Sequence, residues 1–322
     1  MKKLIGLVAI IAVVYTLIGY WWSIPPRDNL VIDLPENAVA GHETTQALIE
    51  TANAIINKPG TFKGGYISND RNPLLPGFYI DNIKSWEYGV LIQVRDTAAE
   101  MRNGFGKPRS QGEENDFLAK ADPKFQSDNM YWLFPEAESV YLEGIEFLEK
   151  YRDQLSDQNK ASAQFYTRAD NLEEWLGIVS TRLGDYSQKL SNSREKLNIN
   201  VDLAGDSVAT QSTPTQEQTT EKTPWTQLDN NFYEAQGYAW ATVQVMRAMA
   251  VDFEDVLKDK NALPNFLQIL EDLQETQKPI YSPMILNGSG NGFWANHSLW
   301  LANYISRANA GVIDIRDLLN RG

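Results

Sequence analysis

The sequence predicts an all-α protein with one N-terminal transmembrane helix and a soluble antiparallel helical bundle that carries long loops. Three observations predict this fold class. An uncharged run covers residues 4–22, three later segments space their apolar residues by alternating steps of four and three, and strand-like patterning is limited to residues 62–67. Steps of four and three place apolar side chains along one face of a helix. Long helices joined by short connections pack as antiparallel bundles.

The N-terminal segment 1–24 is the predicted membrane anchor. Residues 4–22 carry no charged side chain, and as a helix they would extend roughly 28 Å, close to the thickness of the hydrocarbon core of a bilayer. The aromatic residues 20–22 end this run, and such rings favour the membrane interface. Two prolines at 25–26 then stop the helix.

A cleaved signal peptide is the alternative interpretation of this segment. It requires a shorter apolar region and small residues at the cleavage site, whereas this run ends in bulky aromatics. An uncleaved anchor is therefore favoured. Lys2 and Lys3 place the N-terminus in the cytoplasm, because positive residues flank membrane helices on the cytoplasmic side. The expected location is the bacterial inner membrane, crossed once, with the soluble domain in the periplasm of a Gram-negative cell.

Composition limits the classes of ligand. The chain has 322 residues, a net charge of −13, no cysteine and two histidines. The length allows a sizeable core. The acidic balance argues against nucleic acid, because phosphates are bound by clustered Lys and Arg. The absence of cysteine excludes disulfides and thiolate ligands, and two histidines give a poor zinc set. We therefore expect no metal site and no cofactor.

Residues 25–42 read as an extended stalk, and residues 43–200 as a first helical lobe. The lobe begins with an amphipathic helix over residues 43–57 and continues with a loop over residues 60–83. Turn-forming Gly, Pro and Asn recur every few residues in this loop. It is long for an ordinary connection, which raises the chance of a role in binding, although a packed surface loop is the more ordinary interpretation.

Three apolar seams predict helices that pack on one another. The first consists of Phe165, Ala169, Leu172, Leu176, Val179, Leu183, Tyr186 and Leu190. The second consists of Leu228, Phe232, Ala235, Ala239, Thr242, Met246, Met249, Phe253 and Val256. The third consists of Trp294, Ser298, Leu301, Ile305, Ala308, Val312, Ile315 and Leu319.

A polar segment, residues 201–224, separates the first two seams. It is rich in Ser, Thr, Gln and Pro and cannot bury enough apolar surface to become ordered. Residues 225–322 then form a second helical lobe. Two interpretations stay open at this point: a disordered linker between two lobes, or a long loop within one bundle.

The candidate binding residues lie in two regions. One is the loop near residues 60–83 and the start of the helix after it, with Tyr66, Asn69, Asp70, Tyr79 and Trp86. The other is the stretch NGSGNGFWANH, with Asn287, Ser289, Asn291, Trp294 and His297. A glycine loop before a helix can bind an anion through free N–H groups, but this stretch lacks the spacing and the lysine of nucleotide-binding loops. A turn that caps the last helix is favoured, with His297 as a hydrogen-bonded histidine at the edge of the core.

Glu87 and Asp81 are the candidate catalytic residues. Glu87 lies between two aromatic residues, and an apolar environment raises a carboxyl pKa toward the value that a general acid needs. The ordinary interpretation, a hydrogen-bonded or ion-paired glutamate with Arg95 as a partner, is favoured.

Several long motifs resemble one bacterial family. They include GGYISND, PGFYIDNIKSWEYGVLIQVRD, FYTRADNLEEWL, FYEAQGYAWA and SPMILNGSGNGFWANHSLWLANYISRANAGVIDIRDLL. In order and spacing they are similar to domain-of-unknown-function family twenty-three thirty-three, over nearly the whole chain after the anchor. The resemblance implies an anchored helical envelope protein of Gram-negative bacteria. It implies no activity and no catalytic residues.

The sequence thus favours a non-catalytic envelope factor that is anchored by residues 4–22 and binds another envelope protein or a cell-wall component. The alternative is a tethered hydrolase or lytic enzyme that acts on peptidoglycan or another envelope glycan. A homo-oligomer formed through one of the seams is a third interpretation.

Overall fold

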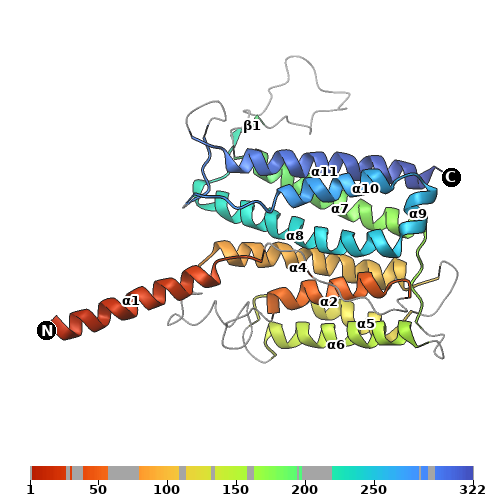
Figure 1. Cartoon of the computed structure of the whole chain (residues 1–322), viewed down its shortest axis with the longest axis horizontal. Coiled ribbons are helices and arrows are strands. Elements are labelled where there is room, and N and C mark those ends of the chain that lie inside the picture. Colours follow the sequence, from red (N-terminus) through yellow and green to blue (C-terminus); the bar gives the residue numbers. More distant parts are fainter. Residues whose placement is uncertain are drawn as a thin grey trace, which may run out of the picture.

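The helices lie side by side in three layers (Figure 1). The computed structural model describes residues 2–26, 30, 39–56, 80–108, 114–131, 135–157, 163–193, 196–197, 220–282, 284–288 and 294–321. Helices α4 (Asn82–Glu100) and α8 (Leu228–Asp252) form the central layer. Helices α7, α10 and α11 cover one face of this pair, and helices α2, α5 and α6 cover the other.

Helix α1 (Lys2–Trp22) projects from one end of the bundle (Figure 1). It is long and apolar enough to cross a membrane, by length and composition, and only Gly19 and Trp22 are buried against other parts of the chain. We call the end at which α4, α8 and α11 begin the near end, because α1 meets the bundle there. We call the end at which these helices finish the far end.

The two central helices approach each other at backbone distance. An ideal Cβ atom on Gly89 would lie 2.0 Å from the carbonyl oxygen of Glu234, and one on Gly237 would lie 2.0 Å from that of Trp86. Glycine removes the side chain that would hold the helices apart, so the near-end halves of α4 and α8 pack more closely than other helix pairs can.

Helices α4 and α8 run parallel, although most neighbouring helices in the bundle run antiparallel. Trp86 packs on Trp240 with ring centroids 5.2 Å apart, and further along both helices Phe105 packs on Phe253 at 5.6 Å. The pair is far apart in the sequence, so no short connection forces opposite directions.

Helix α4 continues at the far end into a π-helical turn, η2 (Met101–Phe105). Such turns place an extra residue in a helix and often lie at functional sites. The backbone N–H of Gly106 closes the turn by donating to the carbonyl oxygen of Met101, at 2.8 Å.

Helices α7 (Ala169–Ser191) and α11 (His297–Asn320) form an antiparallel pair. Arg316 donates to Glu173 toward the far end, and the hydroxyl groups of Ser187 and Ser306 are hydrogen-bonded toward the near end. Helix α10 (Leu263–Glu275) packs beside α11 and α8. The short α9 (Glu254–Asp259) connects α8 to it.

On the opposite face, α2 (His42–Ile56) packs against α6 (Ala137–Ser156) and α8. Helix α5 (Asp116–Phe125) runs antiparallel to α6, with Gly144 of α6 against the ring of Phe125. One buried hydrophobic cluster extends from α2 to α11, so the helices on both sides of residues 201–219 contribute to the same core.

The three predicted seams form helices α7, α8 and α11, and the first predicted helix forms α2. Helix α7 begins at Ala169, so Phe165 reaches the core from the segment before it. The third seam was predicted to begin at Trp294, but this residue precedes α11 and is 63% exposed, so it is not part of the packed face. Phe253 ends α8, so the second seam extends over two helices. The sequence also predicts helices over residues 85–106 and 137–155, which form α4 with η2 and α6. Two helices, α5 and α10, lie outside all the predicted segments.

The remaining described elements are short. Strands β1 (Lys196–Leu197) and β2 (Thr220–Glu221) pair antiparallel, and the 3-10 turn η4 (Trp225–Gln227) leads into α8. Residues 57–79 and 198–219, which hold most of the predicted loop and most of the polar segment, lie outside the described residues.

Candidate functional site

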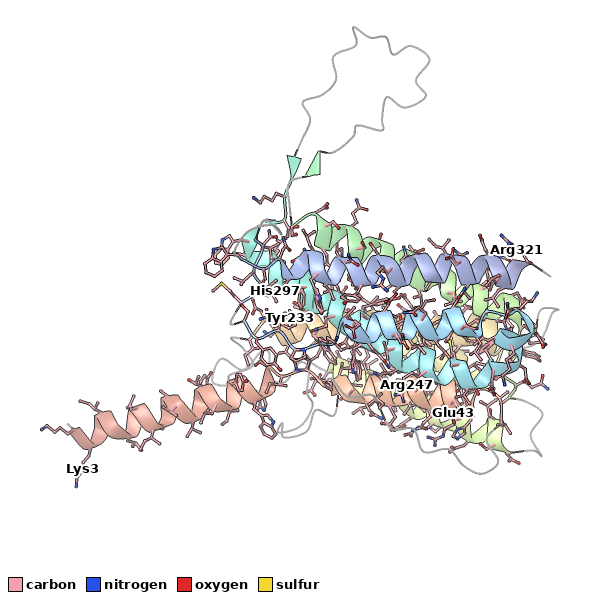
Figure 2. All side chains as sticks on the ribbon, turned by 45° about the horizontal axis from the view of Figure 1, so that its top comes forward. Lys3, Glu43, Tyr233, Arg247, His297 and Arg321 are labelled. Carbon is pink, nitrogen blue, oxygen red and sulfur yellow. The ribbon has the colours of Figure 1, made fainter. Side chains whose placement is uncertain are left out.

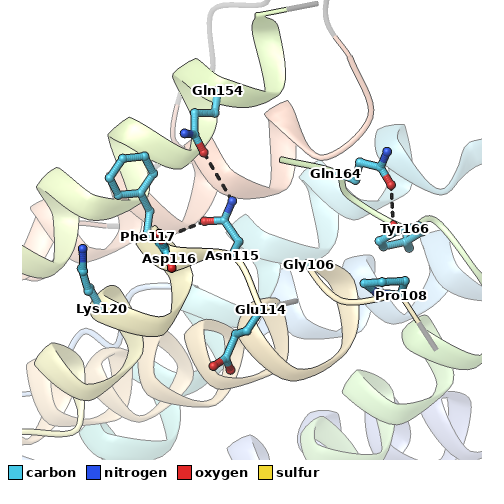
Figure 3. Close-up of a pocket in the computed structure, with 10 residues that line it drawn as sticks. All are labelled: Gly106, Pro108, Glu114, Asn115, Asp116, Phe117, Lys120, Gln154, Gln164 and Tyr166. Atoms are coloured by element: carbon cyan, nitrogen blue, oxygen red, sulfur yellow. Dashed lines mark hydrogen bonds between the residues drawn. The ribbon is translucent and has the colours of Figure 1, made fainter. Parts of the chain in front are cut away.

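A pocket of about 410 Å³ opens at the far end of the bundle (Figure 3). Ligand pockets for small molecules commonly have volumes of roughly 300–1,000 Å³. Four separate stretches of chain supply its walls: the turn after η2, the start of α5, the last turns of α6 and the segment before α7. The residues that line it are Gly106, Pro108, Glu114, Asn115, Asp116, Phe117, Lys120, Gln154, Gln164 and Tyr166.

Asn115 fixes one wall of the pocket. Its side-chain oxygen accepts hydrogen bonds from the backbone N–H groups of Phe117 and Leu118, at 2.9 and 3.3 Å, and so caps the N-terminus of α5. Its amide nitrogen donates to Oε1 of Gln154 on α6, at 3.3 Å. The cap therefore also ties α5 to α6 at the mouth of the pocket.

Tyr166 and Gln164 form the opposite wall. The backbone N–H of Tyr166 donates to the carbonyl oxygen of Phe105, at 2.8 Å. The Tyr166 hydroxyl donates to the side-chain oxygen of Gln164, and the Tyr151 hydroxyl donates to the backbone carbonyl of the same residue, at 2.9 Å. The segment before α7 is thus attached to η2 and to α6 by hydrogen bonds.

Amide donors are available in the pocket. Within the described part of the chain, the side-chain nitrogens of Gln154 and Gln164 donate to no protein group, although the oxygens of both amides accept hydrogen bonds. Phe117 and Tyr166 add two half-buried rings. Two amide donors beside two aromatic faces suit a ligand that carries carbonyl or hydroxyl oxygens and some apolar surface.

Two acidic side chains line the pocket, Glu114 and Asp116, and an ion pair holds Glu114 in its charged form. Nε of Arg102 lies 2.5 Å from Oε1 of Glu114, and the same guanidinium lies 3.2 Å from Asp122. The hydrogen bond from Arg102 is the main reason why the pKa of Glu114 lies below its ordinary value. A carboxyl group held this way is a good acceptor and a poor proton donor.

The predicted catalytic residues are not part of this pocket. Glu87 is 3% exposed on α4, and Asp81 is exposed just before that helix. Arg95, the partner expected for Glu87, instead donates to the carbonyl oxygens of Phe125 and Ser127. Neither carboxyl group lines the far-end pocket.

Trp86, one of the predicted binding residues, lies in the core. It is 1% exposed and packs against Trp240 in the crossing of α4 and α8. The other four predicted residues of this region, Tyr66, Asn69, Asp70 and Tyr79, lie outside the described residues.

The two ends of the glycine stretch pair with each other, and the last residue before the helix caps it. Asn287 and Asn296 form a β-bridge, and the side-chain oxygen of Asn296 accepts from the backbone N–H of Leu299 at the start of α11, at 2.9 Å. The cap at Asn296 agrees with the role that the sequence favoured, and the residues of the predicted turn, 289–293, lie outside the described residues. Ser289 and Asn291 lie outside the described residues.

His297 links the turn to the helix. Its ring Nδ1 accepts from the backbone N–H of Leu286 at 3.0 Å, and the backbone N–H of His297 donates to the carbonyl oxygen of Leu286. Burial lowers the pKa of His297, which agrees with a neutral ring that accepts at Nδ1. Trp294, three residues earlier, is 63% exposed.

Glu100 is a titratable group that sequence patterns did not single out. It is 7% exposed beside η2, and burial, followed by the negative charge of Glu174, raises its pKa to about 7. In the described part of the chain its Oε1 has no hydrogen-bond partner. Only the spacing of this residue within a long apolar helix face could have indicated its burial.

No group of three or more His, Asp or Glu residues in the described parts of the chain is arranged to hold a metal ion. A family model described as an uncharacterized protein conserved in bacteria (DUF2333) matches residues 1–322. No curated protein and no solved structure matches the chain.

Proposed function

This chain belongs to the bacterial family DUF2333, as its motifs predicted, and we propose that it is a membrane-anchored binding protein of the cell envelope. In this proposal α1 crosses the inner membrane with its N-terminus in the cytoplasm, and the bundle stands in the periplasm. The far-end pocket binds a polar cell-wall component that carries amide and hydroxyl groups.

The proposed location rests on α1 and its flanks. The helix is apolar over a length that matches the bilayer. Lys2 and Lys3 precede it and the aromatic residues 20–22 end it, which favours retention as an anchor with a cytoplasmic N-terminus.

The position of the pocket is the observation that carries the proposal. The pocket lies where α4 and α6 finish, at the end of the bundle opposite to α1 (Figure 1). Helix α11 has 24 residues, so the bundle separates its two ends by about 36 Å. In the proposed orientation the pocket therefore lies on the side of the bundle that faces away from the membrane, which supports a ligand outside the membrane.

The ion pair of Glu114 with Arg102 argues against Glu114 as the acid of a glycan hydrolase. Hydrolysis of a glycan requires a carboxyl group that is protonated near neutral pH, so its pKa must be raised. Arg102 shifts the pKa of Glu114 in the opposite direction. The strongly raised carboxyl, Glu100, lines no part of the pocket.

The test measures binding of the full-length protein to purified peptidoglycan by co-sedimentation in detergent. The double variant Gln154→Leu and Gln164→Leu removes both free amide donors at nearly constant side-chain size. Gln274→Leu, an exposed residue on α10 outside the pocket, is the matched control. Loss of two hydrogen bonds should weaken binding by about tenfold or more, because each contributes about 1 kcal/mol.

Binding that is equal for the double variant and the control would overturn the pocket as the binding site. If the wild-type protein does not sediment with peptidoglycan, the cell-wall ligand is wrong. In that case a photo-crosslinking residue that replaces Phe117, at the pocket wall, would identify an envelope protein as the ligand.

A further inference from the structure

We infer that the near end of the bundle carries a second membrane contact, in which exposed aromatic side chains rest in the interface of the bilayer that α1 enters. We call these residues the near-end patch, and they are Trp225, Tyr281, Met284 and Trp294. The inference deepens the proposed function and rests on its membrane anchor.

Hydrogen bonds bring the segments of the near-end patch together. The backbone N–H of Thr223, two residues before Trp225, donates to the carbonyl oxygen of Asn192 at 3.0 Å. The side chain of Asn287 donates to the next carbonyl, that of Ser193, at 2.5 Å. The turn before α8 and the turn before α11 therefore meet at the C-terminal end of α7.

The patch exposes large apolar side chains at unusual levels for a folded domain. Tyr281 is 95% exposed, Trp225 81%, Trp294 63% and Met284 62%. Scattered exposed apolar residues are ordinary, but several that gather at one end of a molecule commonly mark a contact surface. Tyr and Trp are the residues that favour the boundary between lipid and water.

The patch lies at the end of the bundle where α1 joins it. Figure 2 places His297 and Tyr233 at that end, and Arg321 at the opposite end. The backbone N–H of Leu30 donates to the side chain of Gln244 on α8, at 2.9 Å, so the chain is attached to the bundle only eight positions after Trp22. Eight residues span at most about 28 Å, so the end of α1 stays within that distance of Gln244.

The end of α1 and the near-end patch also lie at similar positions along the long axis of the molecule. In Figure 1 the last turns of α1 overlap the near end of the bundle along the long axis. The aromatic residues that end α1 are expected at the membrane interface. Side chains of the near-end patch then reach the same depth.

Ion pairs offset part of the acidic charge beside this contact. The net charge of −13 would repel an anionic lipid surface if it were spread evenly. At the near end, however, Glu234 lies 3.5 Å from Lys189, and Glu275 is paired with Lys278. The contact therefore depends on burial of apolar surface and is expected to be insensitive to salt.

A second contact would fix the orientation of the bundle relative to the membrane. A bundle tethered only by the stalk could tilt, whereas α1 and the near-end patch together define its orientation. The pocket would then stay at a constant height above the membrane, about the length of α11.

The absence of cysteine in this chain allows a direct test. Single-cysteine variants of the full-length protein, Met284→Cys and Tyr281→Cys, are labelled with an environment-sensitive fluorophore and reconstituted in lipid nanodiscs. Lipids that carry a nitroxide near the headgroup serve as the quencher. Ile313→Cys, on the exposed face of α11 toward the far end, is the matched control, and Val14→Cys in the middle of α1 reports insertion of the anchor.

The inference expects nitroxide lipids to quench most of the fluorescence at positions 281 and 284, and little at position 313. Equal, weak quenching at 281, 284 and 313 would overturn it. A label at 284 that is shielded from water but not quenched by lipid would also overturn it, because a protein or a second copy of the chain would then cover the patch.

The label at position 14 separates this failure from failure of the anchor. If position 14 is strongly quenched by lipids labelled deep in the acyl chain while positions 281 and 284 are not, only the second contact is wrong. If position 14 is not quenched, the membrane anchor of the proposed function fails.

Discussion

The near end of the bundle exposes Trp225 and Tyr281, whereas the far end holds a polar pocket between Asn115, Gln154 and Tyr166. The near end carries exposed apolar side chains although its helices are tightly packed. The far end places titratable and amide groups in the interior or at its edge. One fold thus carries two different surfaces, and each matches what lies at that distance from α1 in the proposed orientation.

The comparison also teaches how each end is stabilised. Close backbone packing of α4 on α8 stabilises the near end, so its exposed aromatics are not required by the core. Hydrogen bonds between helix ends stabilise the far end, where Asp252 and Asn115 both cap helices. The four predictions below test this difference, from the largest expected effect to the smallest.

The largest effect is expected for Gly237→Ala at the near end. The new Cβ would lie 2.0 Å from the carbonyl oxygen of Trp86, and a backbone atom cannot move without separating the two helices. We expect a loss of at least about 3 kcal/mol in the free energy of unfolding, measured by denaturant titration in detergent.

Gly184→Ala is the control for helix propensity. A Cβ at this position would meet only Asn309, at 3.6 Å. The control should gain up to about 1 kcal/mol, because alanine is the better helix former. Similar stabilities of the two variants would refute the close crossing of α4 and α8.

At the far end, Glu100→Gln should change how stability depends on pH. The folded protein raises the pKa of this carboxyl from 4.5 to about 7. The protonated carboxyl contributes to the free energy of unfolding. This contribution is fully present below the unfolded pKa of 4.5 and is lost as the pH rises through the folded pKa of about 7. The difference amounts to about 3 kcal/mol.

The glutamine variant is neutral at every pH. Its free energy of unfolding should therefore equal that of the wild type below about pH 4.5, exceed it increasingly as the pH rises to about 7, and stay higher by a constant amount above that. Chemical denaturation over a series of pH values measures this difference, with Glu174→Gln, the exposed neighbour, as a control that shifts the profile only slightly. A difference between variant and wild type that is constant over the whole pH series would contradict the raised pKa.

A third effect, of about 2 kcal/mol, is expected for Asp252→Ala. The carboxylate accepts hydrogen bonds from the backbone N–H groups of Gly41 and Thr44 and from the Thr44 hydroxyl, at 2.9, 2.8 and 2.7 Å. It therefore acts as the N-terminal cap of α2 from another helix.

Asp252→Asn keeps one acceptor oxygen and should lose less stability than the alanine variant. Hydrogen exchange at the first turn of α2 measures the local effect. Protection there that is unchanged in both variants would show that the cap does not stabilise the far end.

The smallest effect is expected for Tyr281→Ser in the near-end patch. This side chain is almost fully exposed, so its replacement should change the free energy of unfolding in detergent by less than about 0.5 kcal/mol. The same replacement at the buried Tyr238 on α8 should lose at least about 3 kcal/mol. Comparable losses at the two positions would mean that the patch belongs to the core.

Helices that pack along their whole length could be predicted from the sequence. Leu172, Leu176, Val179 and Leu183 are all buried on α7, because each turn of this helix meets the core in the same way and leaves a regular pattern. Helix α5 was not predicted, because it is short and contains Pro123. Proline is unfavourable in the interior of a helix.

The candidate site could not be predicted in this way. Its walls come from segments that include Gly106, Asn115, Gln154 and Tyr166, and the residues between them have other roles. Polar residues at helix ends carry no periodic pattern, so only their meeting in space marks a pocket. The glycine stretch before α11 was the more conspicuous signal, and there the structure places a helix cap at Asn296.

The sequence by itself determined the apolar N-terminal helix, the acidic and cysteine-free composition, the family and the three long seamed helices. These depend on residue type and on spacing within one segment, both of which are local. The tertiary structure alone decided that α4 and α8 run parallel at backbone distance, that Glu100 is buried, and that the pocket and the aromatic patch lie at opposite ends. These features depend on which segments meet, and the free energy of packing between distant segments decides that.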